Sequence, residues 1–207
     1  MFGAMIEKAV HKSQHCQRNW DLSRSIPEED LQVIETSISS CPSKQNYIFY
    51  DPWMITDRET IDKIYHTTDG FILPDGSSKT NSQTLANLLV VFCESTNYIK
   101  QGIRSDVAVE NKRTEAEHGS MQQQREFAIG IASGYLNLTA SLLGYSTGCC
   151  TCFNGHKIQE IIKTNSRPRL LMGIGFPDKK RPRREHHKEK TFTFPTFEKN
   201  IKVKKIA

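Results

Sequence analysis

Long hydrophobic runs are absent from this chain of 207 residues. No apolar stretch approaches the roughly 18 residues that a membrane-spanning helix needs. The opening residues, MFGAMIEKAVHK, lack the continuous apolar region and the small-residue cleavage site of a signal peptide. Hydrophobic residues form 37% of the composition, as is usual for soluble proteins. We therefore expect a cytoplasmic protein that has no membrane partner.

Cysteine is too sparse and too irregularly spaced to form a disulfide framework. Three of the six cysteines lie close together, but no second Cys-x-x-Cys pair exists to complete a tetrahedral zinc site. The histidines that could complete such a site are His156, His186 and His187. We expect reduced thiols and no bound metal. The six cysteines are Cys16, Cys41, Cys93, Cys149, Cys150 and Cys152.

Acidic residues become scarce toward the end of the chain. From Lys163 onward there are 14 Lys and Arg residues but only 4 Asp and Glu. Such a segment can bind nucleic acid, or it can supply one local phosphate site on an otherwise solvated extension. Aromatic residues are not interleaved with the basic run KKRPRR, and no nucleic-acid-binding motif is present. Nucleic-acid binding is therefore the less favoured alternative.

The patterns that are present predict an α+β fold with a few central strands and long flanking helices. Ser25, Pro27 and Glu28 form a capping-box start, and Pro42 ends the helix that follows. LLVVFC (88–93) is a continuous apolar run, which indicates a central strand covered on both faces. We expect helices at residues 5–13, 27–40, 58–67, 121–144 and 156–164, and strands at 53–56, 88–93 and 169–176.

Three segments have special character. The expected helix at 121–144 is apolar on most faces and rich in Gly, Ala and Ser, so we expect it to be buried and closely approached by another backbone or a flat ligand. Residues 95–120 are polar and poorly periodic, as in a surface excursion or a lid. Residues 191–206 alternate like an extended strand. We therefore divide the chain into a domain over 1–190 and an arm over 191–207.

Taken in order, these pieces resemble the nitroreductase family of FMN-dependent oxidoreductases. QHCQRNW (14–20) stands where the family has a basic, hydroxyl-bearing segment. PSKQN (42–46) matches a Pro-Ser-x-x-Asn loop, and Pro52-Trp53 matches an aromatic Pro-Trp pair. LGYSTG (143–148) ends the long small-residue helix, and GIGFP (173–177) precedes the basic run. The resemblance covers roughly residues 5–190 and implies a nitroreductase fold: a central, mostly antiparallel sheet flanked by helices, in a domain-swapped homodimer.

The resemblance implies how the phosphate of FMN is bound. A flavin phosphate is a dianion that needs fixed cations and hydrogen-bond donors. This role falls to Arg181 and Arg183 and to the first segment. Gln14 stands in place of the family's arginine and Cys16 in place of its serine, which removes a cation and leaves a poorer donor. His15 or the backbone would then have to donate instead.

The same resemblance places residues around the flavin ring. Arg18 stands where the family has a cation near the N1 and O2 edge, and a fixed guanidinium there would favour the reduced anionic flavin. Asn81 and Gln83 fall in the region that hydrogen-bonds the pyrimidine edge. It also implies that the backbone of one loop lies beside the flavin N5; this loop contains Cys149, Cys150, Thr151 and Cys152. A second loop would contact the flavin of the other subunit; its residues are Pro42, Ser43, Lys44 and Asn46.

The implied activity is the reduction of nitroaromatic, quinone or related electron-poor compounds by NAD(P)H in a ping-pong cycle. FMN would carry the chemistry, so no catalytic side chain is required. The expected partners are a second copy of the chain and a small-molecule electron acceptor. The helix at 121–144 would form the dimer core, and the arm at 191–206 would wrap the partner or extend its sheet. A flavin-binding protein with specialised or lost reductase activity is the alternative, because of Gln14 and Cys16.

Overall fold

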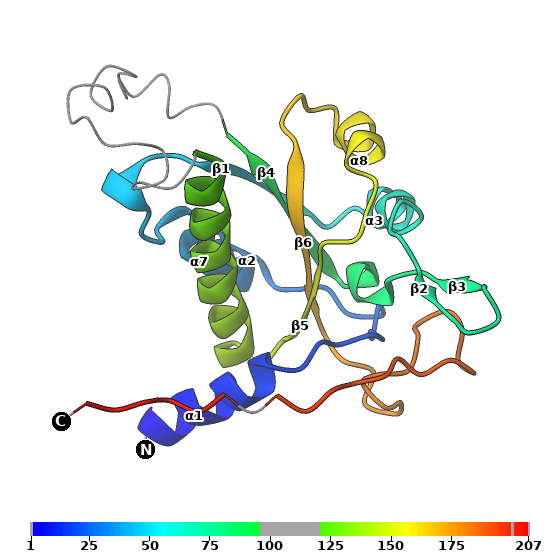
Figure 1. Ribbon diagram of the computed structural model, residues 1–207. Coiled ribbons are helices and arrows are strands. Elements are labelled where there is room, and N and C mark those ends of the chain that lie inside the picture. Colours follow the sequence, from blue (N-terminus) through cyan, green and yellow to red (C-terminus); the bar gives the residue numbers. More distant parts are fainter. Residues whose placement is uncertain (1, 96–120, 200, 207) are drawn as a thin grey trace.

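A four-stranded antiparallel sheet forms the centre of the protein. The computed structural model describes residues 2–95, 121–199 and 201–206. The strand order is β1-β4-β6-β5, so β4 and β6 are central while β1 and β5 form the edges (Figure 1). All neighbouring pairs are antiparallel. The strands are β1 (Tyr50–Ile55), β4 (Leu88–Glu94), β5 (Ser146–Cys150) and β6 (Pro168–Gly175).

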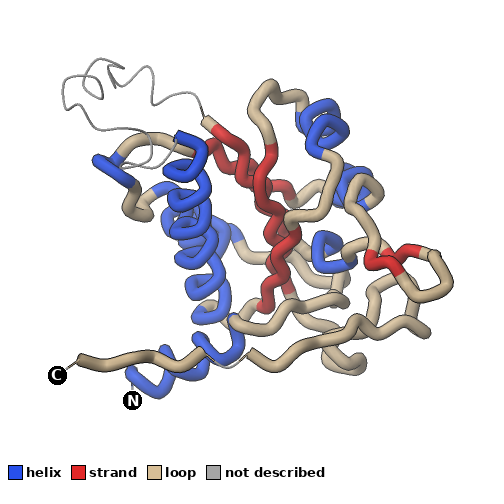
Figure 2. The backbone as a smooth tube through the Cα atoms, viewed as in Figure 1, coloured by secondary structure: helices blue, strands red, loops and turns tan. Residues whose placement is uncertain are grey.

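Helices cover both faces of this sheet. α2 (Glu28–Ser39) and α7 (Met121–Leu142) lie on one face, and α3 (Arg58–Tyr65) and α8 (Gly155–Ile162) lie on the other (Figures 1 and 2). Side chains alternate along β4, so that it contributes to a separate apolar core under each pair of helices. The remaining elements are α1 (Phe2–Ser13), the 3-10 helices η1 (Lys44–Asn46) and η2 (Ser82–Leu85), and the small hairpin of β2 (Phe71–Ile72) and β3 (Ser78–Lys79).

The predicted α+β class and antiparallel sheet are confirmed, and the five predicted helices are all present. Two strands of the central sheet differ from the prediction. β1 begins at Tyr50 and includes Pro52, which an edge strand tolerates because one side of its backbone needs no ladder hydrogen bond. β5 was predicted as part of a loop, because STGCC lacks the apolar alternation of a typical strand. The hairpin β2–β3 also lies in a predicted loop.

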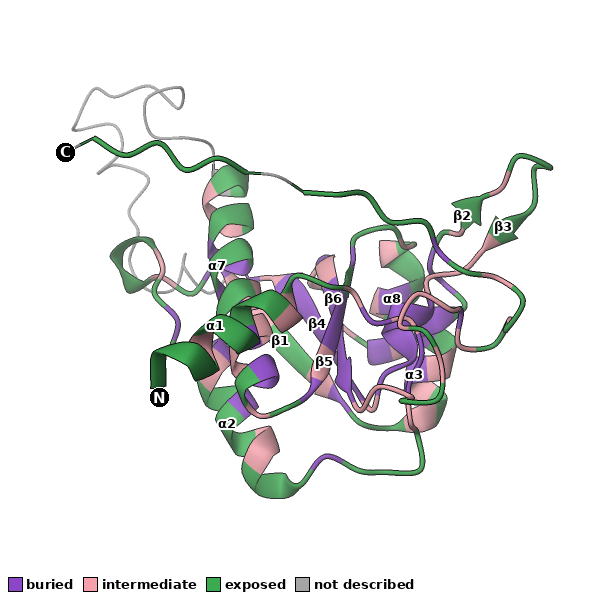
Figure 3. Ribbon diagram, turned by 90° about the horizontal axis from the view of Figure 1, so that it is seen from below, coloured by how far each residue is buried: buried purple, intermediate pink, exposed green. Residues whose placement is uncertain are grey.

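The helix α7 is only half buried by its own chain. Ala132 and Leu136 are fully covered by the sheet side, whereas Phe127 is 63% and Tyr135 49% exposed (Figure 3). The prediction of a buried helix is therefore wrong for the single chain. Gly130 has open space where a side chain would stand. The predicted excursion at 95–120 lies, apart from Ser95, outside the described residues.

The end of the chain first folds back on its own domain. Glu185 and Thr193 form a β-bridge, and the backbone N–H of Phe194 donates to the Arg184 carbonyl oxygen at 2.9 Å. Beyond this point the backbone is extended, and Phe197 is 89% exposed. The predicted arm is thus anchored on its own chain up to residue 194. Within the described residues, no helix is both long and apolar enough to cross a bilayer.

Candidate functional site

The outer edge of β5 is the structural base of the site. The backbone N–H of Gln17 donates to the Thr147 carbonyl oxygen at 2.8 Å, so the segment before Arg18 continues the sheet. Gly148 permits this approach. A Cβ at that position would stand 2.5 Å from the Cβ of Gln83 and 2.9 Å from the carbonyl oxygen of Gln17. The absence of a side chain at Gly148 therefore allows residues 16–18 and η2 to meet on the strand.

Arg18 connects these two segments. Its Nη1 donates to the side-chain oxygen of Gln83 and, at 3.4 Å, to that of Asn81. Gln83 in turn donates its Nε2 to the Cys149 carbonyl oxygen at 3.1 Å. The Nε and Nη2 groups of Arg18 have no hydrogen-bond partner in the described parts of the chain. These donors remain available to a ligand.

A cavity of about 600 Å³ opens beside Arg18. One wall is formed by residues 14–16 and another by residues 194–199. Among the described residues that line it, Arg18, Arg183, Arg184 and Lys199 carry a permanent positive charge, and only Glu198 is acidic. Such an excess of fixed cations favours an anionic ligand.

His15 stands at the same wall. Desolvation, followed by the charges of Arg183 and His11, lowers the pKa of His15. The ring is therefore neutral at pH 7 and can act as a hydrogen-bond donor or acceptor.

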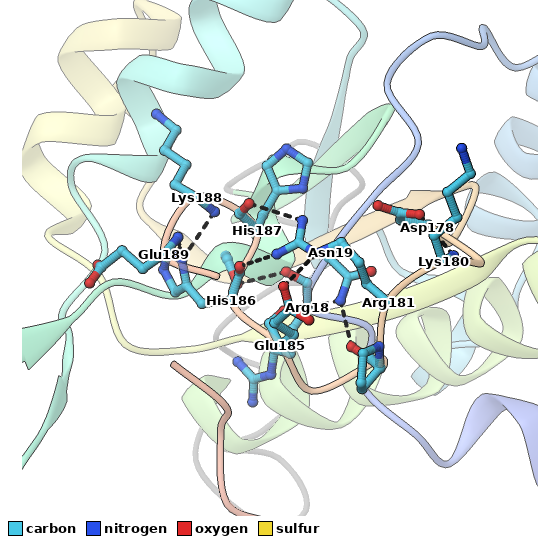
Figure 4. A network of polar contacts seen from close by, with 12 residues as sticks. Arg18, Asn19, Asp178, Lys180, Arg181, Glu185, His186, His187, Lys188 and Glu189 are labelled. Carbon is cyan, nitrogen blue, oxygen red and sulfur yellow. Dashed lines mark hydrogen bonds and ion pairs between the residues drawn. The ribbon is translucent and has the colours of Figure 1, made fainter. Parts of the chain in front are cut away.

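The two arginines predicted to bind phosphate have different surroundings. Arg183 lines the cavity and donates its Nη1 to the Cys16 carbonyl oxygen at 3.3 Å. Arg181 instead donates to the Glu185 carboxylate at 2.6 Å and to the carbonyl oxygens of His186 and His187 at 2.6 and 3.1 Å (Figure 4). All three of its guanidinium nitrogens have partners inside the loop. Its contacts fit a structural role, so we do not retain Arg181 as a phosphate ligand.

The cysteines near the site are thiols of low reactivity. Burial raises the pKa of Cys16, although Arg18 and Arg183 act in the opposite direction. Cys149 reaches the surface, but desolvation by its neighbours still raises its pKa to about 12, and desolvation has the same effect on Cys150. A thiol with a raised pKa is protonated at pH 7 and is a poor nucleophile. Among the described residues, no group of three or more His, Cys, Asp or Glu side chains is placed to hold a metal ion.

The predicted loop at Pro42–Asn46 lies far from this cavity within one chain. Ser43 and Lys44 line a different hollow, of about 620 Å³, beside Phe127 on α7. The Arg18 segment lies near the other end of α7, where Asn137 donates to the Ser13 carbonyl oxygen at 3.0 Å. At 1.5 Å per helical residue, positions 127 and 137 are about 15 Å apart along the helix axis. The predicted site residues therefore form two separate groups in a single chain.

The remaining members of the predicted set lie outside the Arg18 cavity. Asn46 and Pro42 are exposed on the distant loop, and Asn46 has a left-handed backbone with φ of 60°. Thr151 lines a third cavity, of about 500 Å³, between α7 and the start of β6. Cys152 is exposed. One chain therefore brings together Gln14, His15, Cys16, Arg18, Asn81, Gln83, Cys149 and Arg183, with Cys150 next in sequence on β5.

Comparison with solved structures decides the fold. No protein-family model and no curated protein sequence matches the chain. A nitroreductase family protein of Streptococcus pneumoniae aligns over 99% of this chain and 100% of its own, with 13% identity and a TM-score of 0.62. A protein of Bacillus subtilis assigned as the nitroreductase ydfN aligns over 96% of both chains, with 16% identity and a TM-score of 0.66. The chain has the nitroreductase fold.

A further structure with this nitroreductase fold includes the expected cofactor. It is a complex with FMN of a protein from Exiguobacterium sibiricum assigned as a nitroreductase. It aligns over 84% of this chain and 89% of its own, with 15% identity and a TM-score of 0.61. The resemblance inferred from sequence is thus confirmed for the fold.

The cavity residues of this nitroreductase-fold chain fit a flavin mononucleotide. Arg183, Arg184 and Lys199 suit a phosphate dianion because they supply both charge and donors. The free Nε and Nη2 groups of Arg18 suit the carbonyl and nitrogen edge of a ring. Phe194 and Phe197 add apolar walls.

Sequence reasoning missed the contribution of the chain's last segment to this cavity. Phe194 and Lys199 both line the cavity of their own chain. That the arm also contacts a partner subunit stays a prediction. The alternation in TFTFPTF indicated an extended segment, but such a pattern does not tell which surface the segment covers.

Proposed function

We propose that this protein is an FMN-dependent oxidoreductase that uses NAD(P)H to reduce nitroaromatic, quinone or related electron-poor small molecules. The observation that carries the proposal is the cationic cavity at the edge of β5, beside the Arg18–Gln83 contact. Several of the residues that line it are ones that the resemblance assigns to FMN binding, and the chain has the nitroreductase fold. FMN, when bound, would supply the group that accepts and returns a hydride.

The chain's own residues would bind and orient the cofactor. Arg183, Arg184 and Lys199 would hold the phosphate, with His15 as an additional neutral donor. Arg18 would face the pyrimidine edge of the ring, while Gln83 holds its guanidinium. NAD(P)H and the electron acceptor would use the open face in turn, which is the binding order of a ping-pong enzyme.

We further propose that the active form is a homodimer. Within one chain, the loop with Ser43 and the Arg18 segment line separate hollows, about 15 Å apart along the axis of α7. The exposed face of α7, with Phe127, Ile131 and Tyr135, is an apolar surface that a second copy could cover. Two copies that pack along α7 in opposite directions would bring the loop of one chain to the cavity of the other.

Colour and flavin titration test the proposal directly. Purified protein, or protein mixed with FMN, should show absorption bands near roughly 370 and 450 nm and should oxidise NADH or NADPH when a quinone or nitroaromatic acceptor is added. Protein that stays colourless with excess FMN would refute flavin binding. Protein that binds FMN but shows no turnover with either nucleotide would instead favour specialised or lost reductase activity.

Nucleic-acid binding through the basic segment receives less support from the side-chain contacts. Lys188 pairs with Asp62 at 2.6 Å and Arg181 with Glu185 at 2.6 Å, so part of the basic charge is already matched within the domain. A nucleic-acid-binding protein would be retained on DNA or RNA in a strongly salt-dependent manner. Removal of residues 179–190 would abolish that retention.

A further inference from the structure

Phe194 is the residue that closes the last segment onto the candidate site. Its side chain is only 3% exposed, in a segment whose later residues are open to solvent. Its backbone is held twice by Arg184: the Phe194 N–H donates to the Arg184 carbonyl oxygen at 2.9 Å, and Arg184 Nη1 donates to the Phe194 carbonyl oxygen at 3.4 Å. The position of this ring is therefore well defined.

The ring of Phe194 lies against the guanidinium of Arg18. The Arg18 Cζ is 4.2 Å from the Phe194 ring centroid, which is within the range of a cation–π contact. Because Arg18 Nη1 is held by Gln83 and Asn81, the guanidinium is restrained both at one edge and over a ring face. Its Nε and Nη2 donors are left for the cavity.

His186 packs against the ring of Phe194. The two rings are stacked with centroids 5.7 Å apart and an interplanar angle of 20°. His186 is completely buried, and its Nδ1 accepts from the backbone N–H of Glu189 at 2.9 Å, while its Nε2 lies 3.2 Å from the Thr80 carbonyl oxygen. A carbonyl oxygen can only accept, so the proton is on Nε2 and the ring is neutral. The stack thus presents a neutral aromatic support to the Arg18 cation.

We propose that Phe194 is a positioning residue that holds the Arg18 guanidinium at the wall of the cationic cavity and thereby adjusts the redox potential of the bound flavin. This rests on the proposed function, since it takes the ligand of the cavity to be FMN. Reduced flavin carries more negative charge than oxidised flavin, so a fixed cation stabilises the reduced form more strongly. A mobile Arg18 would lose part of that preference.

Fluorinated phenylalanines at position 194 test the contact without a change of fold. Fluorine withdraws electron density from the ring face and weakens the attraction to a cation while the ring shape is kept. We expect the Arg18 Nε–H resonance in a proton–nitrogen NMR spectrum, assigned by its loss in Arg18→Lys, to shift stepwise with the number of fluorines. The same series at Phe192, which contacts Phe194 but has no cation–π contact with Arg18 within the described residues, is the control and should not shift it.

Phe194→Leu then tests the effect on the flavin. We expect the affinity for reduced FMN to fall about threefold to tenfold relative to the affinity for oxidised FMN, and the midpoint potential to fall accordingly. Phe194→Trp should restore both, and Phe192→Leu should retain the wild-type potential. An Arg18 resonance that is insensitive to fluorination at 194 would overturn the proposal, as would equal potentials in Phe194→Leu and wild type. Wild-type protein that fails to bind FMN would refute the proposed function instead, and the NMR series would still decide the positioning role.

Discussion

Arg18 and Gln83 are 65 positions apart in the sequence, and the Nη1 group of Arg18 donates directly to the side-chain oxygen of Gln83. The other end of the same amide donates to the Cys149 carbonyl oxygen at 3.1 Å. One side chain from η2 therefore joins the first segment of the chain to the edge strand β5. The shape of the candidate site depends on this bridge, because without Gln83 the Cys149 carbonyl oxygen would lose its side-chain donor and Arg18 Nη1 would keep only its longer hydrogen bond to Asn81.

Gln83→Leu should weaken both the fold and the site. The substitution keeps a similar volume but removes the donor to the Cys149 carbonyl oxygen and leaves Arg18 Nη1 with only the longer hydrogen bond to Asn81. We expect the free energy of unfolding to fall by about 1 to 3 kcal/mol and FMN affinity to fall with it. Urea unfolding and FMN titration measure these two effects. Gln159→Leu, which removes a hydrogen bond at the exposed end of α8, is the matched control. Equal urea midpoints for the two variants would contradict the expectation.

Substitutions of Arg181 and Arg183 should have different effects, one mainly on the stability of the fold and the other mainly on ligand affinity. Arg181→Gln removes contacts with Glu185 and two carbonyl oxygens, so we expect a loss of about 1.5 to 3 kcal/mol in the free energy of unfolding. Arg183→Gln removes a charge that lines the cavity, so we expect FMN affinity to fall about tenfold or more with a smaller change in melting temperature. The reverse pattern would show that Arg181 is the phosphate ligand.

Ile131→Asp tests whether the exposed face of α7 is a dimer surface. A buried carboxylate at such an interface would be strongly unfavourable, so we expect the variant to be monomeric and to bind FMN at least about tenfold more weakly. Light scattering coupled to size-exclusion chromatography gives the mass in solution. Ile72→Asp, at an exposed position on the hairpin, is the control and should leave the mass unchanged. A wild-type protein that is already monomeric would rule out the dimer.

The sequence was a good guide to the parts of the fold that have strong local signals. The apolar run 88–93 indicates β4 without tertiary information. The helix α2 was also predicted, but the capping box was wrong: Pro27 is the N-cap, and no side chain caps the helix. β5 has no such signal, because it is held as a strand by pairing with β6 and by the backbone hydrogen bond from Gln17. Its position at the sheet edge, where Gly148 allows Gln17 and Gln83 to approach, depends on contacts that no local pattern encodes.

The candidate site was only partly predictable for the same physical reason. The resemblance put Arg18, Asn81 and Gln83 at one place, and the structure brings these three side chains together. The role of Phe194 could not be read from the sequence, since an alternating apolar segment can cover its own chain or another. The contacts of Arg181 were equally hidden, because they are made within a loop that has no periodic pattern.

His187 should make the protein less stable in mild acid. Burial, followed by the charges of Arg181 and Arg58, lowers the pKa of His187 to about 4, and its Nδ1 accepts from the Trp20 backbone N–H at 3.1 Å. In the unfolded chain a histidine has a pKa of about 6.5. Between these values the unfolded state binds a proton that the folded state does not. The contribution to stability is therefore complete above pH 6.5 and is lost progressively as the pH falls toward 4.

The measurement is the free energy of unfolding at pH 7.5 and pH 5 for wild type and for His187→Asn. We expect the variant to be less stable at pH 7.5 and to show a smaller decrease at pH 5, because one of the groups that gains a proton on unfolding has been removed. Burial also lowers the pKa of His186, so part of the decrease in stability should remain in the variant. His156→Gln, on an exposed residue in the first turn of α8, is the control and should retain the wild-type pH dependence. An unchanged decrease in His187→Asn would show that the acid sensitivity lies elsewhere in the fold.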